Sequence, residues 1–159
     1  MAASPSEPGQ RSWSEAFRAL SASERLAAIA ALACAGSLVL PWYSAPVEHL
    51  VKTGFGAFGF AKAALLLTDG AALVMLLEVG RGRRPPMPLH EGTLLTAAGV
   101  WTGLIVVYLM LDRPEFDLRG FREEYELGYG VFVALGGAAL LALAGIRVRR
   151  VEALRGKRR

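Results

Sequence analysis

Two long stretches without a charged side chain limit the folds that this chain can adopt. Gly92 to Leu111 and Leu127 to Ile146 are each 20 residues long. As α-helices, each would extend about 30 Å, which is the thickness of the hydrocarbon core of a bilayer. A soluble domain of 159 residues could bury one such helix but not several. Backbone groups in lipid must be satisfied within the protein, so we expect helices, and the alternation typical of a membrane barrel is absent.

Two further apolar segments raise the predicted number of membrane spans to four. The first follows Ser21 and Glu24, which have the spacing of a helix-capping box. The second ends before Pro85 and Pro86, which cannot continue a helix. We therefore predict an all-α membrane protein, in which a bundle of four transmembrane helices occupies residues 25–147. The predicted spans are residues 26–43, 60–79, 92–111 and 127–146.

Side chains at the ends and on the faces of these spans follow patterns known from membrane helices. Trp42 and Tyr43 end the first span, where an aromatic belt is expected. Gly99 and Gly103 form a GxxxG pair in the third span, and the fourth span repeats small residues every four positions. We expect these small-residue faces to pack against protein. The small residues of the fourth span are Gly130, Ala134, Ala138 and Ala142.

The N-terminal segment, residues 1–24, is predicted to be cytoplasmic. Residues 1–11 are rich in Ser, Pro and Ala, a composition typical of disorder. Ser12 to Glu15 has the spacing of a capping box, and Trp13, Phe17 and Leu20 recur at helical spacing. These residues indicate either a short amphipathic helix on the membrane surface or an ordinary cytoplasmic extension.

The distribution of Lys and Arg predicts the orientation of the chain, because these residues concentrate on the cytoplasmic side of a membrane. Thirteen of the 18 lie before the first span, between the second and third spans, or after the fourth. We therefore expect a multi-pass protein of the plasma (inner) membrane with both termini in the cytoplasm. The remaining five, on the other side, are Lys52, Lys62, Arg113, Arg119 and Arg122.

The C-terminal segment, residues 148–159, is predicted to be a basic cytoplasmic tail. Basic clusters beside a membrane are attracted to anionic lipid headgroups, by about 1 kcal/mol per residue near the surface. No aromatic residue is interleaved with this cluster, so we expect no nucleic-acid binding. The residues predicted to contact headgroups are Arg147, Arg149, Arg150, Arg155 and Lys157.

The single cysteine, Cys34, allows no disulfide within the chain. It does not fit a lipoprotein site, because the preceding leucine is one place too late and the apolar run continues past it. A cleaved signal peptide is equally unsupported, since the sequence at Trp42 lacks the small residue required before a cut. Cys34 is interpreted as a buried residue of the first span.

Motifs for catalysis or cofactor binding are weak in this sequence. Gly54 to Gly59 matches GxGxxG, but that motif predicts nucleotide binding only after a strand and inside a βαβ unit, and no strand pattern surrounds it. His49 and His90 fall on opposite sides of the predicted membrane, so with one cysteine they cannot form a metal cluster. No nucleophile elbow, HExxH or P-loop is present. We therefore expect neither cofactor nor enzymatic activity.

Asp69 is the residue that the prediction of membrane spans does not explain. It lies inside the second span, where a carboxylate is costly and is a functional candidate by default. The alternative is a protonated or hydrogen-bonded aspartate that fixes helix packing. Counting about 10 Å down from the outer ends of the neighbouring spans reaches Ser37 and Thr102. We predict that Asp69 faces the bundle interior and forms a hydrogen bond with Ser37, Thr68 or Thr102.

Several short stretches support the predicted architecture by resemblance. These are Leu40 to Tyr43, Thr53 to Gly59, Leu89 to Ala98 and Asp112 to Pro114. With them, most of residues 25–147 resembles small four-helix integral membrane proteins of actinobacteria. The resemblance implies the four-helix architecture and implies no activity.

The favoured interpretation is a non-enzymatic membrane scaffold or interaction protein. The alternative is a small transporter or ion pathway that uses Asp69. Besides anionic lipid, we expect either a membrane-protein partner or a second copy of the chain, and the sequence leaves these open. A transporter requires a polar cavity that reaches Asp69, whereas a scaffold requires Asp69 to be packed.

Overall fold

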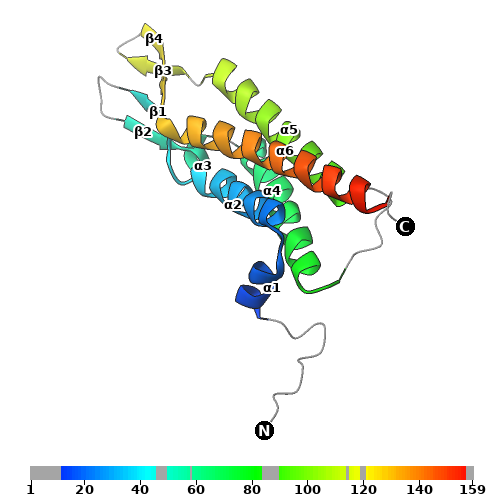
Figure 1. Cartoon of the computed structure of the whole chain (residues 1–159). Helices are drawn as coiled ribbons and strands as arrows, with labels where there is room; N and C mark the ends of the chain where they lie inside the picture. Colours follow the sequence, from blue (N-terminus) through cyan, green and yellow to red (C-terminus); the bar gives the residue numbers. More distant parts are fainter. Residues whose placement is uncertain are drawn as a thin grey trace.

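The computed structural model describes residues 12–45, 50–57, 59–83, 90–113, 115–118 and 121–156. This part of the chain is mostly helical, and short strands gather at one end of the helices (Figure 1). The predicted disorder of residues 1–11 and the last residues of the basic tail lie outside the described residues.

Three helices of the described chain are long and apolar enough to cross a membrane. They are α4 (Phe60–Gly80), α5 (Glu91–Leu111) and the Tyr129–Leu154 part of α6 (Tyr129–Gly156). They match the spans predicted at 60–79, 92–111 and 127–146. However, α6 continues past Ile146, so most of the predicted basic tail extends the helix.

The first predicted span is only partly helical. Helix α2 (Ala22–Ser37) has 16 residues, or about 24 Å, and it is followed by a turn and by a strand that contains Tyr43. Its capping box is present: Ser21 Oγ accepts from Glu24 N at 3.3 Å, and Glu24 Oε2 accepts from Ser21 N at 2.6 Å. The shorter helix α1 (Trp13–Ala19) begins with the second predicted capping box, formed by Ser12 and Glu15.

Small residues bring α5 and α6 together, so these faces pack against protein, as predicted. A Cβ atom at Gly99 would collide with the backbone of Ala142, and one at Gly145 would collide with the backbone of Thr96. A Cβ atom at Gly103 would lie 3.8 Å from the Cβ of Ala138. Because Gly99 and Gly145 carry no side chains, the backbones of α5 and α6 lie in direct contact.

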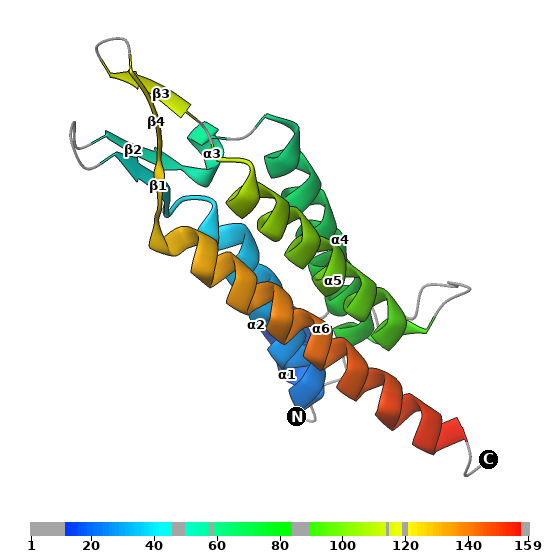
Figure 2. The ribbon, with the colours of Figure 1, turned by 90° about the horizontal axis from the view of Figure 1, so that it is seen from above.

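Five short strands and one short helix form a cap at the end of the bundle where α4 begins and α5 ends (Figures 1 and 2). Strand β1 is the centre of a three-stranded antiparallel sheet, β2–β1–β5, and β3 pairs with β4 in a separate hairpin. The cap consists of β1 (Pro41–Ala45), β2 (Leu50–Thr53), α3 (Gly54–Ala57), β3 (Glu115–Leu118), β4 (Phe121–Glu124) and β5 (Glu126–Leu127). Thus β1 joins the two predicted outer loops in one sheet, which the hydropathy pattern did not predict.

Two aromatic residues of β1 anchor the cap to the helices. The register with β2 shifts between Pro41 and Tyr43, and both Trp42 and Tyr43 are completely buried. Trp42 Nε1 donates to the carbonyl of Ser37 at 2.7 Å, and Tyr43 Oη donates to the carbonyl of Leu109 at 2.5 Å. These side chains therefore face protein instead of forming the predicted aromatic belt.

The other end of the bundle is closed by α1, which packs against the end of α4. Ala16 is completely buried, and a Cβ atom at Gly80 would collide with its carbonyl group. Arg81 lies over the ring of Trp13, with 4.8 Å between Cζ and the ring centroid. The contact fixes α1 to the bundle, although Trp13 itself is 65% exposed.

Candidate functional site

Three polar side chains are buried among the described residues, and all three were predicted from the sequence. They are Ser37, Asp69 and Thr102, which are 1%, 0% and 0% exposed. They come from α2, α4 and α5. The depth count along the predicted spans therefore selected the residues that this helical interior encloses.

Asp69 and Thr102 are in direct contact across α4 and α5. Thr102 Oγ1 donates to Asp69 Oδ1 at 3.3 Å, so the predicted hydrogen bond is present. The other carboxylate oxygen, Oδ2, is buried and has no hydrogen-bond partner within the described part of the chain. A buried carboxyl group with a single long hydrogen bond is incompletely satisfied, which is costly in an apolar interior.

The other two candidate hydroxyls bond within their own helices. Ser37 Oγ donates to the carbonyl of Cys34 at 2.6 Å, and Thr68 Oγ1 donates to the carbonyl of Ala64 at 2.8 Å. Serine and threonine in membrane helices commonly satisfy themselves in this way. Of the three predicted partners, only Thr102 bonds to Asp69.

No cation faces Asp69 among the described ion pairs, which both involve Glu78. Lys62, on the same face of α4, instead donates from Nζ to the carbonyl of Phe55 at 3.1 Å. An uncompensated charge in an apolar interior is expensive, so the neutral carboxyl group fits this environment better than the carboxylate. The arrangement can hold a proton and can fix α4 against α5.

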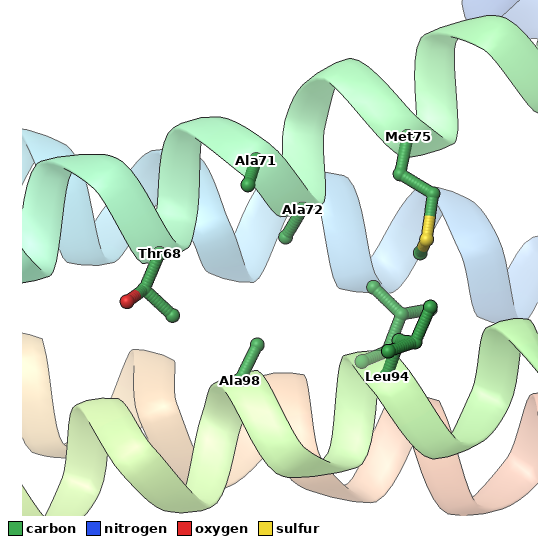
Figure 3. Close-up of a pocket in the computed structure, with 7 residues that line it drawn as sticks. Thr68, Ala71, Ala72, Met75, Leu94 and Ala98 are labelled. Atoms are coloured by element: carbon green, nitrogen blue, oxygen red, sulfur yellow. The ribbon is translucent and has the colours of Figure 1, made fainter. Parts of the chain in front are cut away.

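An apolar cavity of about 250 Å³ separates α4 from α5 next to this contact. Figure 3 shows the side chains of both helices pointing into the gap. Asp69 does not line this cavity. Its neighbour in sequence, Thr68, does line it and is the polar residue among the lining side chains. The cavity is lined by Thr68, Ala71, Ala72, Met75, Leu94, Leu95 and Ala98.

The glycine motif at Gly54 requires a correction. No strand was predicted before it, but β2 ends at Thr53, immediately ahead of Gly54. This strand belongs to an antiparallel sheet, so the βαβ context of a nucleotide site is not formed by the described strands. Instead, Gly54 is buried against Leu38 and Trp42, where a Cβ atom would be too close to both. Its role here is close packing under the cap.

The predicted headgroup residues extend along the end of α6. Arg147, Arg149 and Arg150 are exposed and lie on the helix itself. The side chain of Arg155 and all of Lys157 lie outside what the structure describes. The basic cluster is therefore partly held on a rigid helix.

The described residues contain no cluster of three His, Cys, Asp or Glu side chains that could hold a metal ion. His49 lies outside the described residues, and His90 is the exposed N-cap residue of α5. Cys34 is buried in α2, as expected, with Sγ 3.6 Å from the carbonyl of Ala134.

Sequence reasoning missed the residues that fix the cap. Gly128 N donates to the carbonyl of Trp42 at 2.7 Å, and a Cβ atom at Gly128 would collide with the carbonyl of Pro41. Lys52 places Nζ 4.6 Å from the ring centroid of Tyr125. The β-branched and aromatic content of residues 41–53 was the available indication of strands.

Comparison with known proteins adds no relative: no family model, curated protein or solved structure matches this chain.

Proposed function

We propose that this chain is a non-enzymatic membrane scaffold or interaction protein that presents the strand-bearing cap outside the cell. In this proposal α2, α4, α5 and α6 are four membrane spans, and the protein lies in the plasma (inner) membrane. The first span, residues 26–43, combines the 16-residue helix α2 with the turn after it and the start of β1, where Trp42 and Tyr43 are buried in protein. Both termini are cytoplasmic, and α1 is an interfacial helix.

The burial of Asp69 carries this proposal. Its side chain is completely enclosed and held by Thr102, as a packing residue is expected to be. A solute pathway needs a water-accessible carboxyl group, and this one has no exposed surface. The cap, fixed by the buried side chains of Trp42 and Tyr43, offers a rigid surface for a partner.

The proposed orientation is supported by the basic residues at the end of the bundle opposite the cap. The end opposite the cap carries Arg81 and Arg83 after α4, and Arg147, Arg149 and Arg150 on α6. Reporter fusions at Arg159 and near Glu115 should report opposite sides of the membrane. A C-terminal reporter that is active outside the cell would contradict the proposed topology.

Anionic lipid is the partner proposed for the basic end of α6. A peptide of residues 147–159 should bind anionic vesicles and be released by salt, because surface attraction is screened. Equal binding to neutral vesicles would contradict this electrostatic role.

The second candidate is a small proton or ion pathway, favoured by one observation. Asp69 Oδ2 is buried without a hydrogen-bond partner among the described residues, as in a site that exchanges a proton. The two candidates separate in proteoliposomes that contain the full chain and an internal pH dye. Under the scaffold proposal, the wild type and Asp69→Asn give the same low proton flux. A wild-type flux that Asp69→Asn abolishes would select the pathway instead.

Partners are tested by cross-linking in native membranes, purification of the full chain and mass spectrometry. The scaffold proposal predicts one reproducible membrane-protein partner, or a second copy of the chain, retained equally by the wild type and Asp69→Asn. Recovery of the chain alone at physiological expression would contradict it.

A further inference from the structure

Two apolar hollows lie side by side on α4. The first, of about 250 Å³, lies between α4 and α5. The second, of about 500 Å³, lies on the adjacent face of α4 and includes Leu66, Val74 and Glu78. Ala71 and Met75 line both, so the two are neighbours on the same helix. We call the two together the α4 furrow.

The length of the α4 furrow, and its position along the bundle, match one leaflet of a bilayer. From Leu66 to Glu78 it follows about 18 Å of helix, at 1.5 Å per residue. Half of a hydrocarbon core is about 15 Å. One end lies at the level of the Asp69–Thr102 contact, in the middle of α4, and the other lies at the end opposite the cap. The furrow thus extends from the bilayer centre to one surface.

The space between α4 and α5 is small compared with a helix. It has a volume of about 250 Å³ along roughly 10 Å of α4, from Thr68 to Met75. A helix with side chains is about 10 Å across, so the same length of a partner helix would need about 800 Å³. A single hydrocarbon chain therefore fits this slot better than a partner helix does. Figure 3 shows the slot, with Ala71 and Ala98 facing each other across it.

Charge at the surface end of the furrow favours an anionic headgroup. Among the described residues that line the second cavity, only Glu78 is charged; it is paired with Arg81 at 2.8 Å and lies 3.9 Å from Arg83. One carboxylate between two guanidinium groups leaves a net charge of +1. The Arg83 side chain is 62% exposed and remains accessible to a phosphate. The carboxylate oxygens of Glu78 face the two arginines. The arginines therefore neutralise the repulsion that Glu78 would exert on an anion.

We propose that the α4 furrow binds one anionic phospholipid of the cytoplasmic leaflet. One acyl chain fills the slot between α4 and α5, and the phosphate contacts Arg83. The choice of leaflet rests on the topology proposed above, whereas occupation of the furrow does not. The bound lipid supplies the packing that α4 and α5 lack below the Asp69–Thr102 contact.

The test uses the full chain in nanodiscs of equal parts phosphatidylglycerol and phosphatidylcholine. After transfer to mild detergent, native mass spectrometry counts the lipids retained per chain. The wild type is expected to retain one phosphatidylglycerol. Ala98→Phe, which fills the slot, should lower that retention about tenfold, the factor that corresponds to losing the burial of two methylene groups. Ala97→Phe is the matched control, because Ala97 is exposed on the same helix.

The headgroup contact is tested by Arg83→Gln in the same discs. It should lower the ratio of phosphatidylglycerol to phosphatidylcholine about fivefold, as expected for about 1 kcal/mol per basic residue at a membrane surface. An unchanged ratio would overturn the headgroup assignment. If Ala98→Phe does not fold, Ala71→Phe fills the slot from the α4 side.

Equal retention by Ala98→Phe and Ala97→Phe would overturn the proposal, because the lipid would then be held elsewhere. A second copy of the chain retained in place of lipid would overturn it as well. Both leaflets of the disc have the same composition, so the result does not depend on orientation. Reporter fusions test the topology separately, and each proposal can fail without the other.

Discussion

Helix α5 lies between two neighbours, and its two interfaces are built in different ways. Towards α6, glycines remove the side chains from the contact, and Gly92 and Gly99 bring the backbones of the two helices together. Towards α4, larger side chains such as Leu94 and Met75 line a cavity of about 250 Å³. Next to that cavity, Thr102 and Asp69 form the side-chain hydrogen bond between the two helices.

The comparison teaches that side-chain size decides how membrane helices associate. Lipid tails are as apolar as leucine, so burying leucine between helices gives little advantage over leaving it in lipid. Close backbone contact gains dispersion energy that lipid cannot supply. The α5–α6 pair is therefore expected to be the rigid part of the bundle. The α4–α5 pair is expected to be the adaptable part.

The largest effect is expected at the α5–α6 interface. Gly99→Phe places a ring where even a Cβ atom would collide with the backbone of Ala142, so the two helices must separate. We expect the free energy of unfolding to fall by about 3 kcal/mol or more, at or beyond the upper end of ordinary overpacking. Titration of the purified chain with SDS in mild detergent measures it.

The control for this variant is Gly103→Ala. A Cβ atom there meets Ala138 Cβ at 3.8 Å, an ordinary contact, so the change should stay within about 0.5 kcal/mol. If Gly99→Phe were as stable as Gly103→Ala, the close α5–α6 contact would be wrong.

A smaller loss of stability is expected at the contact between Gly80 of α4 and helix α1. Gly80→Val would push against the carbonyl of Ala16 and displace α1 from the bundle. Overpacking of this kind costs about 1–3 kcal/mol, and only the docking of α1 is affected. Limited proteolysis should cut the variant between α1 and α2 faster than the wild type. Equal cleavage rates would show that α1 is not held by Gly80.

The Asp69–Thr102 contact is expected to contribute about 1 kcal/mol, because hydrogen bonds between membrane helices rarely exceed 2 kcal/mol. Asp69→Asn keeps an oxygen that accepts from Thr102, so it should fold nearly normally. A double-mutant cycle of Asp69→Ala and Thr102→Val isolates the coupling energy. A coupling of zero would mean that the bond at 3.3 Å contributes nothing to joining α4 and α5.

The smallest effect is expected on the α4 side of α5, one residue away from Gly99. Ala98 lines the cavity, so Ala98→Phe has space for its ring and should change the free energy of unfolding in detergent by about 0.5 kcal/mol or less. The same substitution at neighbouring positions thus separates the two interfaces. A loss at Ala98 as large as that at Gly99 would remove the distinction between them.

Much of the helical bundle could be predicted from the sequence, because lipid allows few backbone structures and because helix depth can be counted. Two uncharged runs located α5 and α6, a further apolar segment located α4, and two Ser–Glu pairs located the starts of α1 and α2. Counting residues from the span ends placed Thr102 at the level of Asp69, and the two are in contact. Local periodicity sufficed for these features.

The cap could not be predicted in the same way. Residues 38–43 are apolar and continue a hydrophobic run, so a short buried strand looks the same as the end of a helix. Pairing of β1 with β5 joins segments far apart in the chain, and no local pattern encodes it. The cavity between α4 and α5 likewise depends on how Met75 and Leu94 meet in three dimensions.

The position of β5 determines when the molecule can finish folding during its synthesis. Tyr43 leaves the ribosome long before Leu127, its partner in the sheet, and Trp42 must wait for Gly128. Closing a connection of roughly 80 residues carries an entropic cost that local helix formation avoids. The cap can therefore close only after the chain has been made as far as Gly128. Until then, β1 lacks the strand that completes one side of its sheet.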